Sequence, residues 1–291
     1  MTGRVALVCS ERGLRVDPDL PIAWSALREP GLLVDLLRWD DPDADWGSYD
    51  LAVIRSCWDY SWRLEEFLGW AADFPDGATR LRNPVEMLRW NTDKTYLLDL
   101  ERAGLPVVPT GWDPRRIADL PDAEEWVVKP SVSAGARDTA RWSEPADVLT
   151  HAAALAGAGR TAMVQPYLDS VDDLGETAML FLGGRFSHAV RKGPLLQRGE
   201  GVRHDRDSRG DLSPVVPTSP QRDVAQAVVD AIPDLTGVDA APLYARIDLL
   251  HDVDGGPVVL ELELTEPSLF LPQAPGAAVT LARAVEAELS R

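Results

Sequence analysis

The chain has 291 residues, and 29 lysines and arginines stand against 47 aspartates and glutamates, for a formal charge of −18 at pH 7. Such a surface repels polyanions, which argues against nucleic acid and anionic membranes as partners and leaves a small molecule as the expected one. No apolar stretch approaches the ~18 residues of a membrane span, and we expect a cytoplasmic protein. Cys9 and Cys57 stand in apolar surroundings and are expected to be buried free thiols. A homodimer is compatible with these properties.

The first part of the chain has the pattern of a small parallel α/β lobe. Residues 4–9 and 50–55 are short runs rich in Val and Ile, which are typical of buried strands. The apolar spacing over residues 26–37 predicts a helix between them. We expect this lobe to span residues 1–85.

A second lobe is expected over residues 107–165. An Asn-Pro start signal and a Gly-x-Pro stop signal predict a helix over 83–103, so that residues 86–106 form a connecting helical region. Within the second lobe we expect a strand, a helix and a strand, at residues 126–130, 144–156 and 162–168.

The remaining residues, 166–291, are expected to form a third lobe. Two strands should turn at the Gly-Gly pair 183–184, and a polar, Gly-rich stretch over 193–215 reads as a loop. A helix, two strands and a last helix are predicted at residues 219–232, 243–250, 257–265 and 277–290. The whole chain is therefore assigned to the α/β class.

The two strands predicted at 243–250 and 257–265 carry the sharpest chemical signal. If the Asp-Gly pair of the connecting HDVDGGP segment forms a two-residue turn, Asp248 lies opposite Glu261 and Arg246 lies opposite Glu263. Three carboxylates then share one face with a guanidinium, and carboxylate oxygens are the ligands that Mg²⁺ prefers. The alternative is a solvated hairpin face whose acids only keep it soluble.

Two lysines favour a metal and phosphate site over a solvated hairpin face. Lys129 ends the apolar strand WVVKP and is followed by SVSAGARDT, residues 131–139, whose small side chains let backbone N–H groups approach phosphate oxygens. Taken alone, this segment could be an ordinary turn, and Lys94 could be a surface lysine on a helix. Neither GxxxxGK[ST] nor GxGxxG is present, so phosphate binding would need another architecture.

The order of these features along the chain resembles the ATP-grasp superfamily, in particular ligases similar to glutathione synthetase. The motifs are DK at 93–94, VVKP with its loop at 127–136, QPYL at 165–168, GE at 175–176, RK at 191–192, R-x-D at 246–248 and ELELTEP at 261–267. The resemblance covers residues ~90–291 and implies an ATP-grasp fold preceded by a Rossmann-like lobe. RSCWDY and ELELTEPSLF also resemble the group that contains the cyclo-ligase of cycloserine biosynthesis.

The resemblance implies roles for individual residues. ATP phosphates would be bound by Lys94, Lys129 and the loop residues Ser133 and Gly135; adenine by Gln165 and the backbone of Tyr167 and Leu168; and the ribose by Glu176. Arg246, with Arg191 or Lys192, would stabilise the transferred phosphoryl group, and Mg²⁺ would be held by Asp248, Glu261 and Glu263. Relatives often have Asn in place of Glu263, so this site is more acidic. The 193–215 loop would bring Arg203, His204 and Arg206 to the substrate.

The expected activity is that of an ADP-forming carbon-nitrogen ligase with ATP and Mg²⁺ as cofactors. It would phosphorylate the carboxylate of an amino-acid-like substrate and let an amine attack the acyl phosphate. Intramolecular ring closure is one alternative, and a nucleotide-binding module without activity is another.

For the substrate carboxylate we expect Arg55, with Ser56 beside it. Arg55 follows an apolar strand whose carboxyl end is the usual ligand-binding edge of a parallel sheet, and a guanidinium matches a carboxylate. A salt bridge from Arg55 to Asp59 is the alternative.

Overall fold

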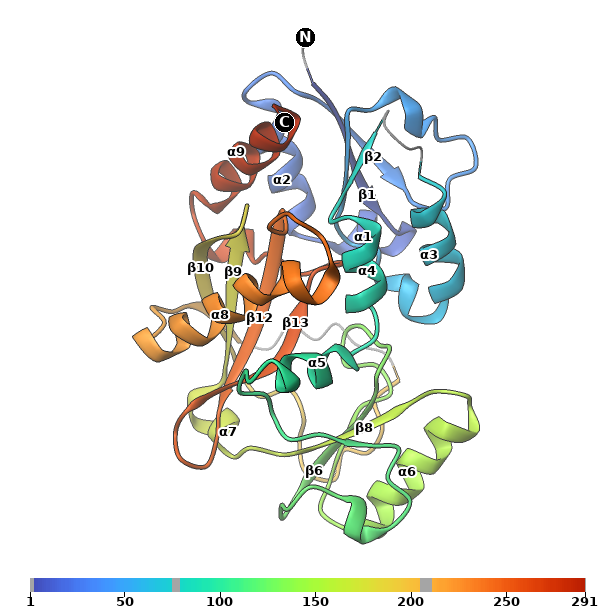
Figure 1. Ribbon diagram of the computed structural model, residues 1–291, viewed down its shortest axis with the longest axis vertical. Coiled ribbons are helices and arrows are strands. Elements are labelled where there is room, and N and C mark those ends of the chain that lie inside the picture. The colour runs from blue at the N-terminus through green and yellow to red at the C-terminus, as the bar shows by residue number, and fades with distance from the viewer. Residues whose placement is uncertain (1–2, 75–78, 205–210, 291) are drawn as a thin grey trace.

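A parallel sheet forms the first lobe of the computed structural model, which describes residues 3–74, 79–204 and 211–290 (Figure 1). Its strands follow the order β2-β1-β3-β4 and are β1 (Arg4–Cys9), β2 (Leu33–Arg38), β3 (Leu51–Ile54) and β4 (Arg80–Arg82). The helices of this lobe are α1 (Glu11–Val16), α2 (Asp19–Arg28) and α3 (Leu64–Ala72). β1 and β3 are buried along nearly their whole length, as their Val-rich sequences predict.

The predicted helix over 26–37 is wrong in its second half. Gly31, whose φ of +97° suits glycine, follows the end of α2, and residues from Leu33 onward pair with β1 as the parallel strand β2. Val34 is buried while Leu33 and Leu36 are exposed, because β2 lies at the edge of the sheet. The four leucines among residues 32–37 imitated helical spacing.

Cys9 and Cys57 are buried free thiols, as expected. They pack in different hydrophobic clusters, Cys9 with Val5 and Leu7, and Cys57 with Ala6 and Val8. Because alternate residues of β1 point to opposite faces of the sheet, the two thiols lie on opposite sides of it.

The connecting region contains two short helices instead of one. These are α4 (Val85–Asn91) and α5 (Tyr96–Arg102), and the backbone N–H of Lys94 in the break donates to Ser131 O at 2.9 Å. Asn91 ends α4 by bonding to β13 (Pro257–Glu263) and the residue that follows it: its side chain donates to Leu262 O at 2.8 Å and accepts from Leu264 N at 2.6 Å. Contacts with distant segments therefore interrupt the predicted helix.

A small antiparallel sheet with its own core forms the second lobe. Its strands follow the order β5-β8-β6-β7 and are β5 (Gly111–Trp112), β6 (Trp126–Pro130), β7 (Ala140–Trp142) and β8 (Ala162–Pro166). Helix α6 (Pro145–Gly157) packs against β6 and β8, and Val128, Val148, Leu155 and Val164 are buried between them. Because this core contains no residue of the other lobes, the second lobe has the organisation of a separate unit.

The third lobe is built on a larger antiparallel sheet in the order β11-β10-β9-β12-β13. Besides β13, its strands are β9 (Glu176–Leu182), β10 (Arg185–Lys192), β11 (Leu212–Pro214) and β12 (Tyr244–His251), and its helices are α7 (Ser170–Leu174), α8 (Ser219–Thr236) and α9 (Ala277–Leu289). The Gly183-Gly184 turn is confirmed. Of the predicted loop over 193–215, residues 212–214 form β11, and Arg206 lies outside the described residues.

The β12–β13 hairpin has the predicted pairing at its chemical end and a different turn. Arg246 pairs with Glu263 and Asp248 with Glu261. His251 pairs with Pro257, so the connection is longer than two residues, and a β-bulge between Asp248 and Leu249 restores the register.

The first and third lobes share one hydrophobic core, in which α2 packs against α9 (Figure 1). That core joins Leu7 and Leu27 of the first lobe to Leu180 and Val285 of the third. The second lobe, with β6, β8 and α6, lies below the other two in the view of Figure 1. In the described part of the chain, no helix has the length and apolar character that a membrane span needs.

Candidate active site

A cavity of about 830 Å³ lies where the three lobes meet. Twelve of the residues expected at a nucleotide site line it: Lys94, Lys129, Ser133, Gly135, Gln165, Tyr167, Leu168, Glu176, Lys192, Arg246, Glu261 and Glu263. Other parts of its wall come from the first lobe, including Asp19, Trp58 and Trp62, and from residues after β13, including Glu266 and Phe270. The structure thus brings together side chains as far apart in the sequence as Asp19 and Phe270.

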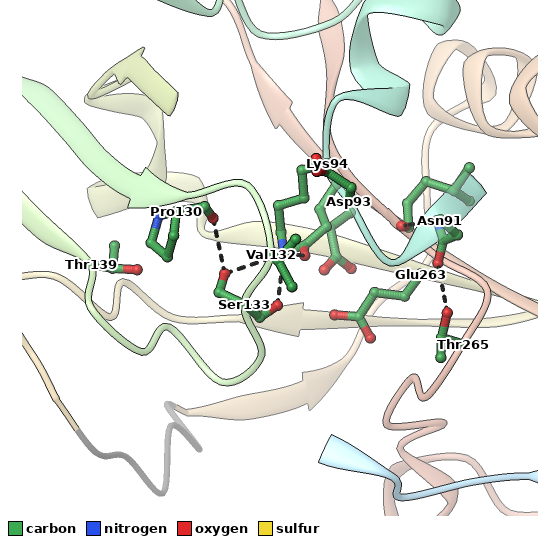
Figure 2. Close-up of polar contacts among 12 residues, drawn as sticks. Asn91, Asp93, Lys94, Pro130, Val132, Ser133, Thr139, Glu263 and Thr265 are labelled. Atoms are coloured by element: carbon green, nitrogen blue, oxygen red, sulfur yellow. Dashed lines mark hydrogen bonds and ion pairs between the residues drawn. The ribbon is translucent and has the colours of Figure 1, made fainter. Parts of the chain in front are cut away.

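Lys94 points into the loop that follows β6 (Figure 2). Its Nζ donates to Ser133 O at 2.8 Å and to Ser133 Oγ at 3.3 Å, and forms an ion pair with Glu261 Oε1 at 3.1 Å. The side chain is buried, contrary to a surface lysine. Lys94 thereby links the small-residue loop to the acidic face of the hairpin.

Lys129 provides a second buried ammonium group in the same wall. Burial lowers the pKa of Lys129, and Glu261 works against that decrease. The loop after it contains residues with positive φ at Gly135, Ala136 and Asp138, and only the first is a glycine. Left-handed backbone at non-glycine residues is a strained conformation that often occurs at ligand-binding loops.

Three carboxylates meet on the β12–β13 hairpin. Each of Asp248, Glu261 and Glu263 offers an oxygen, and these oxygens lie within 4.8 Å of one another. Arg246 holds two of them: it donates to Asp248 at 2.9–3.1 Å and forms an ion pair with Glu263. The oxygen-only donor set suits Mg²⁺, which would take over part of the charge compensation that Arg246 and nearby lysines give here.

The three carboxyl groups differ in acidity because their neighbours differ. Burial would raise the pKa of all three, but Arg246 and Lys192 outweigh it at Asp248, and Lys94 and Lys129 outweigh it at Glu261, so both pKa values are below the usual range. At Glu263 burial dominates over Arg246 and raises the pKa to about 7. Glu263 is therefore the carboxylate that gains most from an added cation.

Replacing Glu263 with Gln should stabilise the ligand-free protein at alkaline pH. A carboxyl group whose pKa is raised to about 7 loses stabilising free energy as the pH rises from its unfolded value of about 4.5 through 7, and Gln has no such loss. We expect the melting temperature of the variant, relative to the parent, to increase from pH 5 to pH 8, and more Mg²⁺ to be needed for nucleotide binding. Melting curves at both pH values, with exposed Glu101→Gln as control, measure this; an unchanged difference would contradict it.

Lys192, and not Arg191, enters the site. Lys192 forms ion pairs with Glu176 and, at 2.8 Å, with Asp248. Arg191 points the other way, where its guanidinium donates to the backbone oxygens of Leu174 at 2.6 Å and Asp173 at 3.1 Å. Adjacent residues of a strand face opposite sides of the sheet, so only one of them can reach the cavity, and the geometry does not support the assignment of Arg191 to phosphoryl transfer.

The pKa of Glu176 is set by its burial and by its ion pair with Lys192. Burial raises its pKa to about 8, although Lys192 opposes the shift. A carboxylate at this place can accept hydrogen bonds from ribose hydroxyls, the role expected for it.

The adenine end of the expected nucleotide site contains Gln165, Tyr167 and Leu168. Gln165 Nε2 donates to Thr110 Oγ1 at 3.1 Å, and its buried Oε1 has no partner among the described residues. The backbone N–H of Tyr167 donates to Glu125 O at 2.8 Å, so only its carbonyl is open to a base. The Arg141 guanidinium stacks on the Tyr167 ring at 3.3 Å and fixes this strand end.

Arg55 and Ser56 lie behind the cavity wall and not in it. Both are 1% exposed; Arg55 Nη2 donates to Pro267 O at 3.0 Å, and Ser56 Oγ donates to Asp17 at 2.9 Å. The direct contact that we expected between Arg55 and a substrate carboxylate is therefore not supported by the geometry. The salt bridge to Asp59 is not formed either, because Asp59 contacts Arg63 instead.

The segment after β10 closes over the second lobe. Arg198 forms an ion pair with Glu125 at 2.9 Å, and Arg203 exchanges backbone hydrogen bonds with residues 138–139. His204 lines the cavity and hydrogen-bonds Asp138 at 3.0 Å. Arg203 itself does not line the cavity, whereas Gly193, Leu195, Leu196 and His204 of the same segment do.

Sequence reasoning did not assign Trp58 and Glu266 of the cavity wall to the site, nor Tyr60, which is buried next to Glu266. The two aromatic residues lie in the 3₁₀ helix η2 (Trp58–Trp62), and Tyr60 hydrogen-bonds the Glu266 carboxylate. The available signal was the acidic TEP segment, which continues the motif that carries Glu261 and Glu263.

Similarity to known proteins identifies the family of this chain. A family model described as the N-terminal domain of D-cycloserine synthetase DcsG matches residues 5–83. The cycloserine biosynthesis protein DcsG of Streptomyces lavendulae is 35% identical over 308 residues, which cover 99% of this chain and 99% of that protein. The chain belongs to the DcsG family.

Solved structures show the fold of this family. The crystal structure of D-cycloserine synthetase DcsG has a TM-score of 0.90 and 33% identity, covering 99% of this chain and 100% of that one. ATP-grasp ligase PsnB, solved with a minimal precursor, Mg and ADP, has a TM-score of 0.64 and 17% identity, covering 99% and 98%. This DcsG-family chain has the ATP-grasp fold, and the expected resemblance is confirmed.

Proposed function

We propose that this protein is an ATP-dependent ligase that closes a ring within one small amino-acid-like substrate and produces ADP and phosphate. The full-length similarity to a cycloserine biosynthesis protein favours ring closure over the ligation of two molecules that we first expected. The use of ATP in this proposal is supported by one observation, the cavity in which buried lysines lie close to three clustered carboxylates. A binding module without activity would not need that acidic cluster.

In this proposal, each charged residue has a task in phosphoryl transfer. Lys94 and Lys129 bind the phosphates of ATP, with the loop after β6 folded over them. Mg²⁺, held by Asp248, Glu261 and Glu263, would neutralise charge on the phosphates and orient them. Arg246 and Lys192 stabilise the negative charge that develops on the transferred group.

The reaction balances in two steps. A substrate carboxylate oxygen attacks the γ-phosphorus, and the bond to ADP breaks. The nitrogen nucleophile of the same molecule then attacks the acyl carbon; the C–O bond to phosphate breaks, and the nitrogen loses a proton. The closed site excludes water, which would otherwise hydrolyse the acyl phosphate.

A linear acid that corresponds to the opened ring tests this function. Hydrolysis of the ring amide of D-cycloserine gives β-aminooxy-D-alanine, which contains both reacting groups. With Mg-ATP, we expect one ADP, one phosphate and one ring product, 18 mass units lighter than the acid, per turnover. Formation of AMP and pyrophosphate would contradict the phosphoryl chemistry, and a strict need for a second amine would restore the two-substrate alternative.

A further inference from the structure

Glu266 is a buried carboxylate of the cavity without a cationic partner. It is 6% exposed and lines the cavity. Of the cavity's other acids, Glu261 pairs with Lys94, Glu263 with Arg246 and Glu176 with Lys192, whereas Asp19 has backbone partners instead of a cation. Within the described residues, no Lys or Arg forms an ion pair with Glu266, and the Tyr60 hydroxyl is its hydrogen-bond partner.

The backbone around Glu266 is held rigidly. Its carbonyl accepts from Trp58 Nε1 at 3.2 Å, and the next carbonyl, of Pro267, accepts from the buried Arg55. Further along, Asp19 accepts from the backbone N–H groups of residues 269–271 at 2.6–3.1 Å. The position of Glu266 is therefore set before any ligand arrives, which reduces the entropy that binding costs.

An unpaired carboxylate in a closed cavity favours a cationic ligand. Removing a carboxylate from water is costly unless a positive charge compensates it, and the nearby Glu263 adds repulsion. Asp19, the other acid of this part of the wall, already accepts three backbone hydrogen bonds and needs no further partner. Trp58 presents an indole to the same cavity, and aromatic faces attract ammonium groups.

We propose that Glu266, with the indole of Trp58, binds the protonated amine of the substrate, so that the ligand class is a small primary amine. The inference rests on the proposed function in that it names the part of the substrate which does not react. Because Glu266 and Glu263 line the same cavity, a substrate held by its amine at Glu266 would have its carboxylate in the cavity of the proposed nucleotide site. Glu266 thus selects amino acids over simple carboxylic acids.

The experiment compares an amine with its deamino analogue. D-Cycloserine and isoxazolidin-3-one, which lacks the amino group, are titrated into the protein in the presence of Mg-ADP. We expect the parent protein to bind D-cycloserine at least tenfold more tightly than isoxazolidin-3-one. In Glu266→Gln that preference should fall to about twofold or less, and in Glu266→Asp it should be partly kept.

Controls separate this result from loss of structure. The surface variant Glu29→Gln removes the same charge and should keep the parent preference. Affinity for Mg-ADP should stay within twofold in all variants. Equal preference in the parent and Glu266→Gln, or no preference for the amine in the parent, overturns the inference. If the preference depends on Glu266 but no ring forms from the linear acid, the amine site stands and the proposed function fails.

Discussion

Asp248→Asn is expected to lower ATP turnover by about a thousandfold or more and to weaken the fold of the ligand-free protein. Asp248 is 1% exposed and accepts from both Arg246 and Lys192. An amide has no charge to offer to a metal ion or to these two cations, and a lost metal ligand costs several kcal/mol in the transition state. Before any metal binds, Asp248 is thus held by two cations, and its loss leaves both of them with one partner fewer.

ADP release and urea unfolding curves measure the two effects. Asp254→Asn is the matched control, because it makes the same substitution at the exposed tip of the same hairpin. It should change neither activity nor stability by more than a small amount. An Asp248→Asn protein with near-parental turnover would exclude the metal role, whereas equal effects of both substitutions would point to the hairpin fold alone.

The acidic face of the hairpin could be predicted because two local rules determine it. Alternation places Glu261 and Glu263 on one side of β13, and an antiparallel pair sets Asp248 and Arg246 opposite them. The turn was not predictable in the same way, because it is longer than assumed and a bulge compensates for the difference. The predicted pairing of Arg246 with Glu263 and of Asp248 with Glu261 was thus correct, although the two-residue turn assumed for it was not.

Contacts between distant segments account for what the sequence did not predict. The spacing over 83–103 is helical, but the chain breaks at Lys94, whose backbone bonds to Ser131 and whose ammonium pairs with Glu261. Asn91 is fixed to the end of β13 in the same way. Such bonds depend on the assembled lobes, and local helix propensity carries no information about them.

Arg55 shows a similar limit. Its place after β3 is the edge where α/β sheets bind ligands, and that rule led to a substrate contact. The residues after β13 fold across this edge, so that Arg55 donates to Pro267 and Trp58 donates to Glu266. Arg55 therefore contributes to the cavity wall indirectly, because it holds the backbone next to Glu266, which does line the cavity.

Lys192→Met is expected to reduce both stability and turnover strongly, while its neighbour Arg191→Ala changes neither by much. Lys192 lies between Glu176 and Asp248, and its removal leaves two buried carboxylates without this cation, at a cost of about 3–5 kcal/mol. Turnover should fall at least a hundredfold, since a charge that faces the transferred phosphoryl group is lost. Among the described residues, the partly exposed Arg191 bonds only to backbone oxygens of residues 173 and 174, so its loss should cost less than about 1 kcal/mol.

Urea unfolding and ADP release on the two variants decide between the adjacent residues. Lys192→Arg should keep the ion pairs in part and recover some stability, which separates loss of charge from loss of side-chain volume. The expected order of turnover is the parent and Arg191→Ala together, then Lys192→Arg, then Lys192→Met. Reversed effects of Arg191→Ala and Lys192→Met would mean that β10 presents its other face to the cavity, and the site geometry described above would then be wrong.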